Sequence, residues 1–199
     1  MKMKVLSICL MSTFLATAPV VSSAPGGSNK GAESQFRSYS DIVSASFYDG
    51  KTNNYVYGRL YDAMNGENYV SIQAQHYSYM TGDYWYISCN RPANGNEVSV
   101  NNGNGKSSLK ATLDPANPQC YSYNVAAPIV IDITGQANGK HTNSSHGQGK
   151  RTNNGETWKY TNQNHNFSID VTGSVGSMDG PWSNGSSSSS RNRNVHAQK

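Results

Sequence analysis

Tyrosine recurs in this sequence at a spacing of two residues. Four successive segments, 43–48, 55–61, 69–75 and 84–89, alternate an apolar residue with Tyr, Ser, Gln or Arg. Side chains at i and i+2 of a β-strand point to the same side of a sheet, so the alternation predicts one apolar and one Tyr-rich face. The candidate binding residues of the Tyr-rich face are Tyr48, Tyr55, Tyr57, Arg59, Tyr61, Tyr69, Gln73, Tyr84 and Tyr86.

These residue types suit the recognition of sugars. A tyrosine offers a flat apolar ring with a hydroxyl group at its edge, so rings along a sheet can stack on sugar faces. Gln, Arg and Ser side chains can then hydrogen-bond to the sugar hydroxyls. The same array would also suit a protein partner, because Tyr is enriched at interfaces. The structural alternative is that cross-strand Tyr pairs only stabilise the sheet, or that the chain ends cover them.

Residues that could carry catalysis or bind a metal ion are few. Asp132 and Asp170 would sit on the polar sides of two strands, where a carboxylate pair could hydrolyse a glycoside if the strands were neighbours. Glu156 and His165 form a second possible acid–base pair. The chain has no Gly-x-Ser-x-Gly motif and no His or Cys spacing typical of a metal site. We therefore expect no catalytic residues, no metal and no cofactor, and keep a small secreted hydrolase as the alternative.

The candidate binding residues require a β-sheet to position them. Besides the four Tyr-containing segments, alternation continues at 98–100, 109–113, 129–133 and 167–171. Asn-Gly occurs seven times, and both residues tolerate the positive φ that tight hairpin turns need. The sequence therefore predicts an all-β fold: an antiparallel β-sandwich or small jelly roll of about eight short strands.

Cysteine usage and the N-terminus predict export. Residues 1–23 combine two lysines, an apolar stretch and a small-residue end, which is the pattern of a signal peptide. Its removal leaves Cys89 and Cys120, and two cysteines in an exported chain most simply form a disulfide. We expect a secreted, extracellular or periplasmic protein that has no membrane span.

Composition divides the remaining chain into three parts. Residues 24–38 are polar and predict a flexible leader, 39–184 predict a single domain, and 185–199 predict a Ser-rich, basic, disordered tail. Gly135–Glu156 reads as a long loop without strand character. Lys and Arg exceed Asp and Glu by four, but much of this excess lies in the signal and the tail. The folded part should therefore be nearly neutral, which argues against nucleic-acid binding.

These observations predict a secreted, non-catalytic binding module. Its partner would be a glycan or another surface protein or matrix macromolecule, held by the Tyr-rich face in an adhesive role. A third possibility is a membrane-active β-rich protein. The sequence does not indicate how many copies of the chain assemble.

Overall fold

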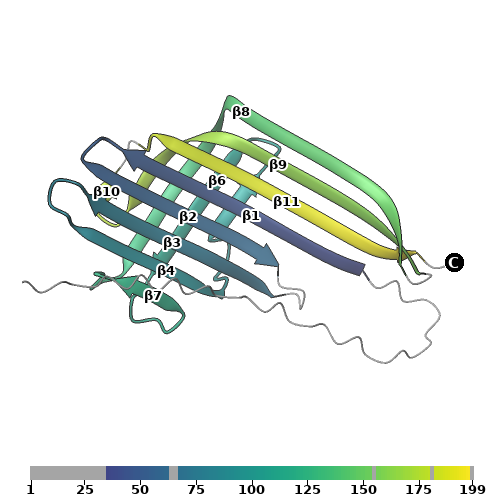
Figure 1. Cartoon of the computed structure of the whole chain (residues 1–199), viewed down its shortest axis with the longest axis horizontal. Coiled ribbons are helices and arrows are strands. Elements are labelled where there is room, and N and C mark those ends of the chain that lie inside the picture. The colour runs from purple at the N-terminus through teal and green to yellow at the C-terminus, as the bar shows by residue number, and fades with distance from the viewer. Residues whose placement is uncertain (1–34, 63–66, 154–155, 180–181, 198–199) are drawn as a thin grey trace, which may run out of the picture. The chain divides into compact units, whose positions relative to one another are not determined.

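Strands account for all the regular structure in the described part of this chain. The computed structural model describes residues 35–62, 67–153, 156–179 and 182–197, and no helix occurs among them. The strands are β1 (Gln35–Tyr48), β2 (Thr52–Asp62), β3 (Asn68–Ser78), β4 (Tyr84–Pro92), β5 (Val98–Asn101), β6 (Lys106–Leu113), β7 (Cys120–Tyr123), β8 (Ile129–Asn153), β9 (Glu156–Val175), β10 (Met178–Asp179) and β11 (Asn184–Ala197) (Figure 1).

The strands join in a single antiparallel sheet. Their order is β5-β6-β8-β9-β11-β1-β2-β3-β4-β7, and β10 pairs with β9 beside this path. The predicted all-β antiparallel fold is confirmed, and so is the disulfide between Cys89 and Cys120. A sandwich or jelly roll is not confirmed, because ten strands follow one another in one sheet.

The sheet bends so that strands from its two ends share a core. In Figure 1, β6 and the first part of β8 pass behind β1–β3, and β5 and β6 contact β1 and β2. Gly58 on β2 allows this close approach, because a Cβ atom there would lie 2.6 Å from Cδ1 of Leu109. The fully buried side chains include Val43, Val56, Val70, Ile72, Ile87, Val98, Leu109, Leu113, Ile131, Ile133 and Val175.

The eight segments with alternating residues all lie within strands, in β1–β6, β8 and β9. Two further predictions about the domain are wrong. The Ser-rich stretch from 185 is not a disordered tail through residue 197, because β11 pairs with β1 on one side and β9 on the other. Its short side chains fit this place, and Ser187 and Ser189 are buried. Backbone hydrogen bonds to two neighbours supply the order that the side chains do not.

The prediction of a loop at Gly135–Glu156 is also wrong. Residues up to Asn153 continue β8, and β9 begins at Glu156, so the two strands form one long hairpin. The ladder shifts register between Ala137 and Thr142, where Gly139 adopts a φ of 72°. This bulge lies where β8 leaves its pairing with β6, and Figure 1 shows β8 changing direction at its upper end.

The domain begins slightly earlier than predicted. The strand β1 starts at Gln35, so the last four residues of the predicted leader 24–38 belong to the sheet. The predicted signal peptide, residues 1–23, and the rest of the leader lie outside the described residues. Among those that are described, the structure contains no helix with the length and apolar character to cross a membrane.

Candidate ligand-binding face

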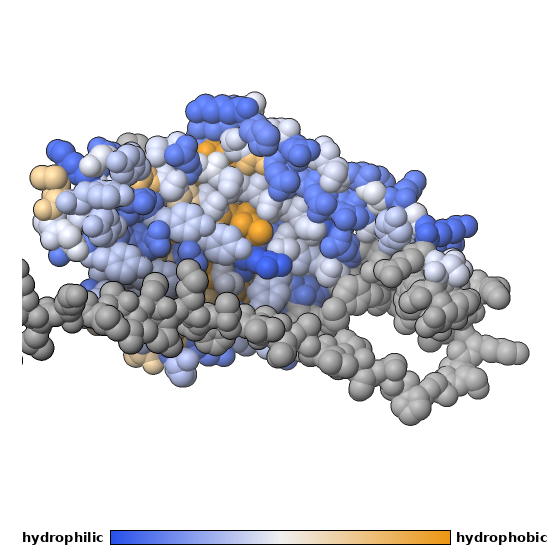
Figure 2. Space-filling model, viewed as in Figure 1, coloured by the Kyte–Doolittle hydropathy of each residue, from blue (hydrophilic) through white to orange (hydrophobic). Residues whose placement is uncertain are grey.

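The nine candidate residues lie on one face of the sheet, pointing away from the core. Their neighbours in sequence, such as Val56, Ala74 and Ile87, point inward and are buried. Arg59 is exposed, and Tyr48 and Tyr84 keep 60 % and 38 % of their surface accessible; the other six are partly buried. Figure 2 shows a mainly pale and blue surface on this side, where β1–β4 face the viewer in Figure 1.

The register of the strands arranges these residues in rows across the sheet. One row consists of Ser46, Tyr55, Gln75, Tyr86 and Tyr123. The next consists of Ser44, Tyr57, Gln73, Ser88 and Tyr121. In both rows a glutamine of β3 lies between a tyrosine of β2 and aromatic residues of β4 or β7. We call this area, formed by β2, β3, β4 and β7, the Tyr–Gln face.

Four tyrosines that the alternating pattern did not single out enlarge this face. Tyr77 lies opposite Tyr84, and Tyr121 and Tyr123 come from β7. Tyr79 stands in the turn after β3 beside Met80, a residue that is 74 % exposed. Tyr77 lies two residues beyond Gln75 in the same strand, so its side chain points to the same face as Gln73 and Gln75. The predicted disulfide between Cys89 and Cys120 implies that Tyr121 and Tyr123 lie beside β4. Both signals were therefore present in the sequence.

Aromatic contacts border the Tyr–Gln face at both ends. At one end a series of rings runs from β1 to β7, with centroid distances of 5.9 Å (Tyr48–Tyr79), 4.7 Å (Tyr77–Tyr79), 6.5 Å (Tyr77–Tyr84) and 5.8 Å (Tyr84–Tyr123). At the other end the rings of Tyr61 and Tyr69 stack with an interplanar angle of 26°. Such pairs rigidify the side chains and keep the rings in fixed positions.

Hydrogen bonding differs between the end and the middle of the face. The hydroxyl groups of Tyr61 and Tyr69 donate to Asn90 Oδ1 and Glu67 Oε2. In the described part of the chain, the hydroxyls of Tyr55, Tyr57 and Tyr86 have no hydrogen-bond partner, and neither do the side-chain amides of Gln73 and Gln75. These central polar groups are free to bond to water or to a ligand.

The face is almost without charge at neutral pH. Among the described residues of β1–β4 and β7, Arg59 is the only ionic side chain that points to this side. Its Nε donates to Ser40 Oγ, and its guanidinium lies 5.1 Å from the centroid of the Tyr61 ring. Arg59 is thus already engaged within the protein.

Burial favours the neutral form of two tyrosines on this side of the sheet, Tyr55 and Tyr84. Burial raises the pKa of Tyr55 above the ordinary value of 10.0, and the neighbouring Tyr57 adds to the shift. Burial likewise raises the pKa of Tyr84, with smaller contributions from Tyr86, Tyr121 and Tyr123. At neutral pH these hydroxyls can therefore both donate and accept hydrogen bonds.

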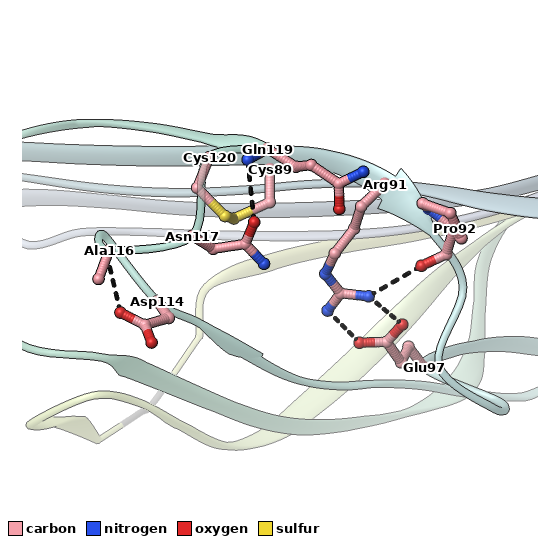
Figure 3. The surroundings of a disulfide bond; sticks show 9 residues. All are labelled: Cys89, Arg91, Pro92, Glu97, Asp114, Ala116, Asn117, Gln119 and Cys120. Atoms are coloured by element: carbon pink, nitrogen blue, oxygen red, sulfur yellow. Dashed lines mark hydrogen bonds and ion pairs between the residues drawn. A yellow bond between two sulfur atoms is a disulfide. The ribbon is translucent and has the colours of Figure 1, made fainter.

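A disulfide attaches the outer edge of the face. Cys89 of β4 and Cys120 of β7 lie directly opposite each other, with Cα atoms 4.0 Å apart (Figure 3). Nearby, the Arg91 guanidinium donates to both carboxylate oxygens of Glu97. The strand β7 has only four residues and pairs with β4, so the disulfide keeps its two tyrosines in place.

The candidate carboxylate pair is not assembled. The strands of Asp132 and Asp170 are neighbours, but Asp132 lies opposite Ser174 and Asp170 opposite Gln136. This four-residue offset corresponds to roughly 13 Å along the strands, beyond the separation that glycoside hydrolysis uses. Asp132 forms an ion pair with Lys110 at 2.9 Å, and Asp170 accepts from Asn138 Nδ2 at 2.8 Å.

The second acid–base pair is separated as well. Glu156 and His165 both belong to β9, nine residues apart, which is about 30 Å in a strand. No group of three or more potential metal ligands comes together within the described ranges. The candidate catalytic residues Asp132, Asp170, Glu156 and His165 therefore do not come together in either of the two pairs that the sequence suggested.

Two hollows occur elsewhere on the molecule. One, of about 510 Å³, is mainly apolar and is lined by Trp85 and the segment 124–130. The other, of about 670 Å³, lies over β5, β6, β8 and β9 and is lined by Ser, Thr, Asn and Lys side chains, with Asp170 at one side. Neither hollow includes a residue of the Tyr–Gln face.

Comparison with known proteins identifies no relative. No protein-family description, no curated protein and no solved structure matches this chain.

Proposed function

We propose that this chain is a non-catalytic binding module that holds a glycan on its Tyr–Gln face. The observation that carries the proposal is the set of free polar groups between fixed aromatic rings. Gln75 lies between Tyr55 of β2 and Tyr86 of β4, and in the row of Gln73 the flanking tyrosines are Tyr57 of β2 and Tyr121 of β7. The amides of both glutamines have no hydrogen-bond partner in the described part of the chain. Rings that can stack beside unoccupied donors and acceptors are what a sugar requires.

The location that we propose for this activity is outside the cytoplasm. The disulfide supports this location, because such bonds persist in oxidising compartments. The predicted signal peptide would provide the route. A surface-exposed glycan or matrix polysaccharide is then the ligand that such a module would meet, and adhesion is its role.

The proposal can be tested by truncating the tyrosines. Tyr57→Ala and Tyr86→Ala should each weaken retention on a glycan matrix by about 5- to 150-fold, since interface aromatics contribute about 1–3 kcal/mol each. Tyr160→Ala is the matched control, because Tyr160 is 40 % exposed but lies on β9, away from the Tyr–Gln face. The control should bind like the unaltered protein.

A stability measurement separates binding from packing. Ile87 is fully buried, so Ile87→Ala should lower the free energy of unfolding by about 2–5 kcal/mol. The Tyr57 and Tyr86 variants should lose much less, because their rings point away from the core. If they melt as early as the Ile87 variant, the tyrosines serve the sheet itself and the glycan proposal fails.

A further inference from the structure

We infer that the glycan is an uncharged, extended polysaccharide chain that lies along β3, rather than a terminal sugar. This inference rests on the proposed function and specifies its ligand. It follows from the width, the length and the charge of the Tyr–Gln face.

The width of the free polar strip is set by the strand order. Gln73 and Gln75 belong to β3, with Tyr55 and Tyr57 on β2 to one side. On the other side the same rows reach Tyr86 on β4 and Tyr121 on β7. Strands lie about 4.8 Å apart, so β2 and β4 are about 10 Å from each other across β3. The strip therefore has room for a single sugar chain flanked by rings.

The length of the strip follows from the tyrosines that close it. Tyr69 and Tyr77 stand on the same side of β3, eight residues apart, which corresponds to about 27 Å. Ser71, Gln73 and Gln75 occupy the positions between them. This distance spans several sugar rings in succession, whereas a single terminal sugar would contact only one ring and one amide.

The neighbouring hydroxyl groups show where the strip ends. The rows continue beyond β2 to Ser44 and Ser186, but their hydroxyls bond to each other at 2.8 Å. At the far end of β4, Asn90 already accepts from Tyr61. The polar groups that remain free are thus concentrated over β2, β3 and β4.

Charge defines the chemical class of the ligand. Arg59, the one ionic side chain directed to this side by the described parts of β1–β4 and β7, is bonded to Ser40 and stacked on Tyr61. An anionic polysaccharide would find no unengaged cation here. The carboxylate nearest the strip belongs to Glu67, which lies before β3 and already accepts from the Tyr69 hydroxyl at the end of the strip. Neutral hydroxyl, amide and ring groups match a neutral polysaccharide.

The test uses defined polymers and a length series. Native-gel affinity electrophoresis would compare the neutral polymers hydroxyethylcellulose, dextran, amylose and mannan with the anionic polymers alginate and heparin. Titration calorimetry would then measure oligosaccharides of the retarding polymer, from the monosaccharide to the hexasaccharide. We expect retardation by a neutral polymer and an affinity that rises about tenfold or more with length, as successive rings are engaged.

Two variants connect the result to the strip. Gln73→Leu and Gln75→Leu keep the bulk of each side chain but remove its hydrogen-bonding groups, so each should weaken hexasaccharide binding several-fold. Gln163→Leu, on the exposed part of β9, is the matched control and should have no effect.

Each outcome has a distinct meaning. Equal affinity for monosaccharide and hexasaccharide, or retardation by anionic polymers only, would overturn the extended neutral ligand while leaving glycan binding intact. Binding that is unaffected by Tyr57→Ala and Tyr86→Ala would move the site away from this face. Retardation by none of the six polymers would overturn both the inference and the proposed function.

Discussion

Asp41 of β1 and Arg191 of β11 form a two-pronged ion pair between positions 150 residues apart in the chain. Arg191 Nη1 lies 2.6 Å from Asp41 Oδ1, and Nη2 lies 3.1 Å from Oδ2. The same guanidinium stands 5.2 Å from the centroid of the Tyr39 ring. Asp41 is 6 % exposed, so the pair joins β1 and β11 at the margin of the core.

Removing this pair should destabilise the sheet. Asp41→Asn should lower the free energy of unfolding by about 1–3 kcal/mol, because the charged hydrogen bonds are lost while Arg191 stays partly covered. The matched control is Asp132→Asn, which removes an ion pair whose side chains are 55 % and 57 % exposed and should cost at most about 1 kcal/mol. Urea denaturation measures both, and equal losses would contradict the structural role assigned to Asp41.

The disulfide should contribute to stability and to binding. Cys89 and Cys120 are 31 positions apart, and closing a loop of this size stabilises a fold by about 3–4 kcal/mol in the chain-entropy estimate. A Cys89→Ser/Cys120→Ser double variant should therefore melt several degrees earlier. It should also bind glycan less tightly, because β7 carries Tyr121 and Tyr123.

Reducing agent provides the control for the disulfide. The unaltered protein should show no free thiol from Cys89 or Cys120 under denaturing, non-reducing conditions, and a reductant should lower its melting temperature. The double variant should not respond to the reductant. Titration of both thiols in the untreated protein would show that the bond does not form.

Alkaline pH should act through the tyrosines. The pKa of Tyr55 is raised in the folded state, so the unfolded chain ionises first as pH increases. The stability contributed by the neutral hydroxyl is therefore complete below the ordinary pKa of 10.0 and is lost above it. We expect unfolding free energy and glycan affinity to stay level near neutral pH and to fall above about pH 10.

Tyrosinate absorbance provides the measurement for this pH dependence. In the folded protein, part of the tyrosine signal should titrate later than in a denatured sample. Tyr55→Phe should reduce that late-titrating part. A folded protein whose tyrosines all ionise together with the denatured chain would contradict the burial of Tyr55.

Glycine at position 58 should be required for packing between β2 and β6. A Cβ atom at this position would lie 2.6 Å and 2.9 Å from the two methyl carbons of Leu109. Gly58→Val should cost about 1–3 kcal/mol through overpacking. Gly147→Val on β8 is the control, since nothing lies within 4 Å of a Cβ atom there. Similar thermal melts for both variants would argue against the shared core.

The sequence predicted those parts of the fold in which the two faces of a strand differ. Val56 and Leu60 alternate with Tyr55 and Tyr57, so the direction of each side chain could be read from the pattern. In β11 that contrast is missing, because Ser186–Ser190 present the same side chain to both faces. The distal part of β8 has the same property, and Gly139 to Gln148 are exposed on both faces. Backbone pairing with neighbouring strands orders these segments, and such pairing cannot be recognised from the types of residue in the sequence.

Turn residues were a less reliable guide than strand residues. Asp49-Gly50 does connect two strands, β1 and β2, with a positive φ at Gly50. However, Asn138-Gly139 forms a bulge within β8, and Asn184-Gly185 begins β11. Asn-Gly permits a sharp backbone bend, and the neighbouring strands decide whether the chain reverses there. The sequence alone could therefore assign the candidate residues to one face of the sheet. Their arrangement in rows could be known only from the register between neighbouring strands in the structure.

The position of β11 has a consequence for how the protein is made. Without β11 the sheet would divide into two hydrogen-bonded groups, β5-β6-β8-β9 with β10 and β1-β2-β3-β4-β7, and β11 is the strand that pairs with both. Among the described strands, it is also the last to leave a ribosome or a translocation channel. The edges of β9 and β1 must therefore stay unpaired until β11 has been synthesised, which predicts slow folding dominated by distant contacts and a period in which strand edges can aggregate.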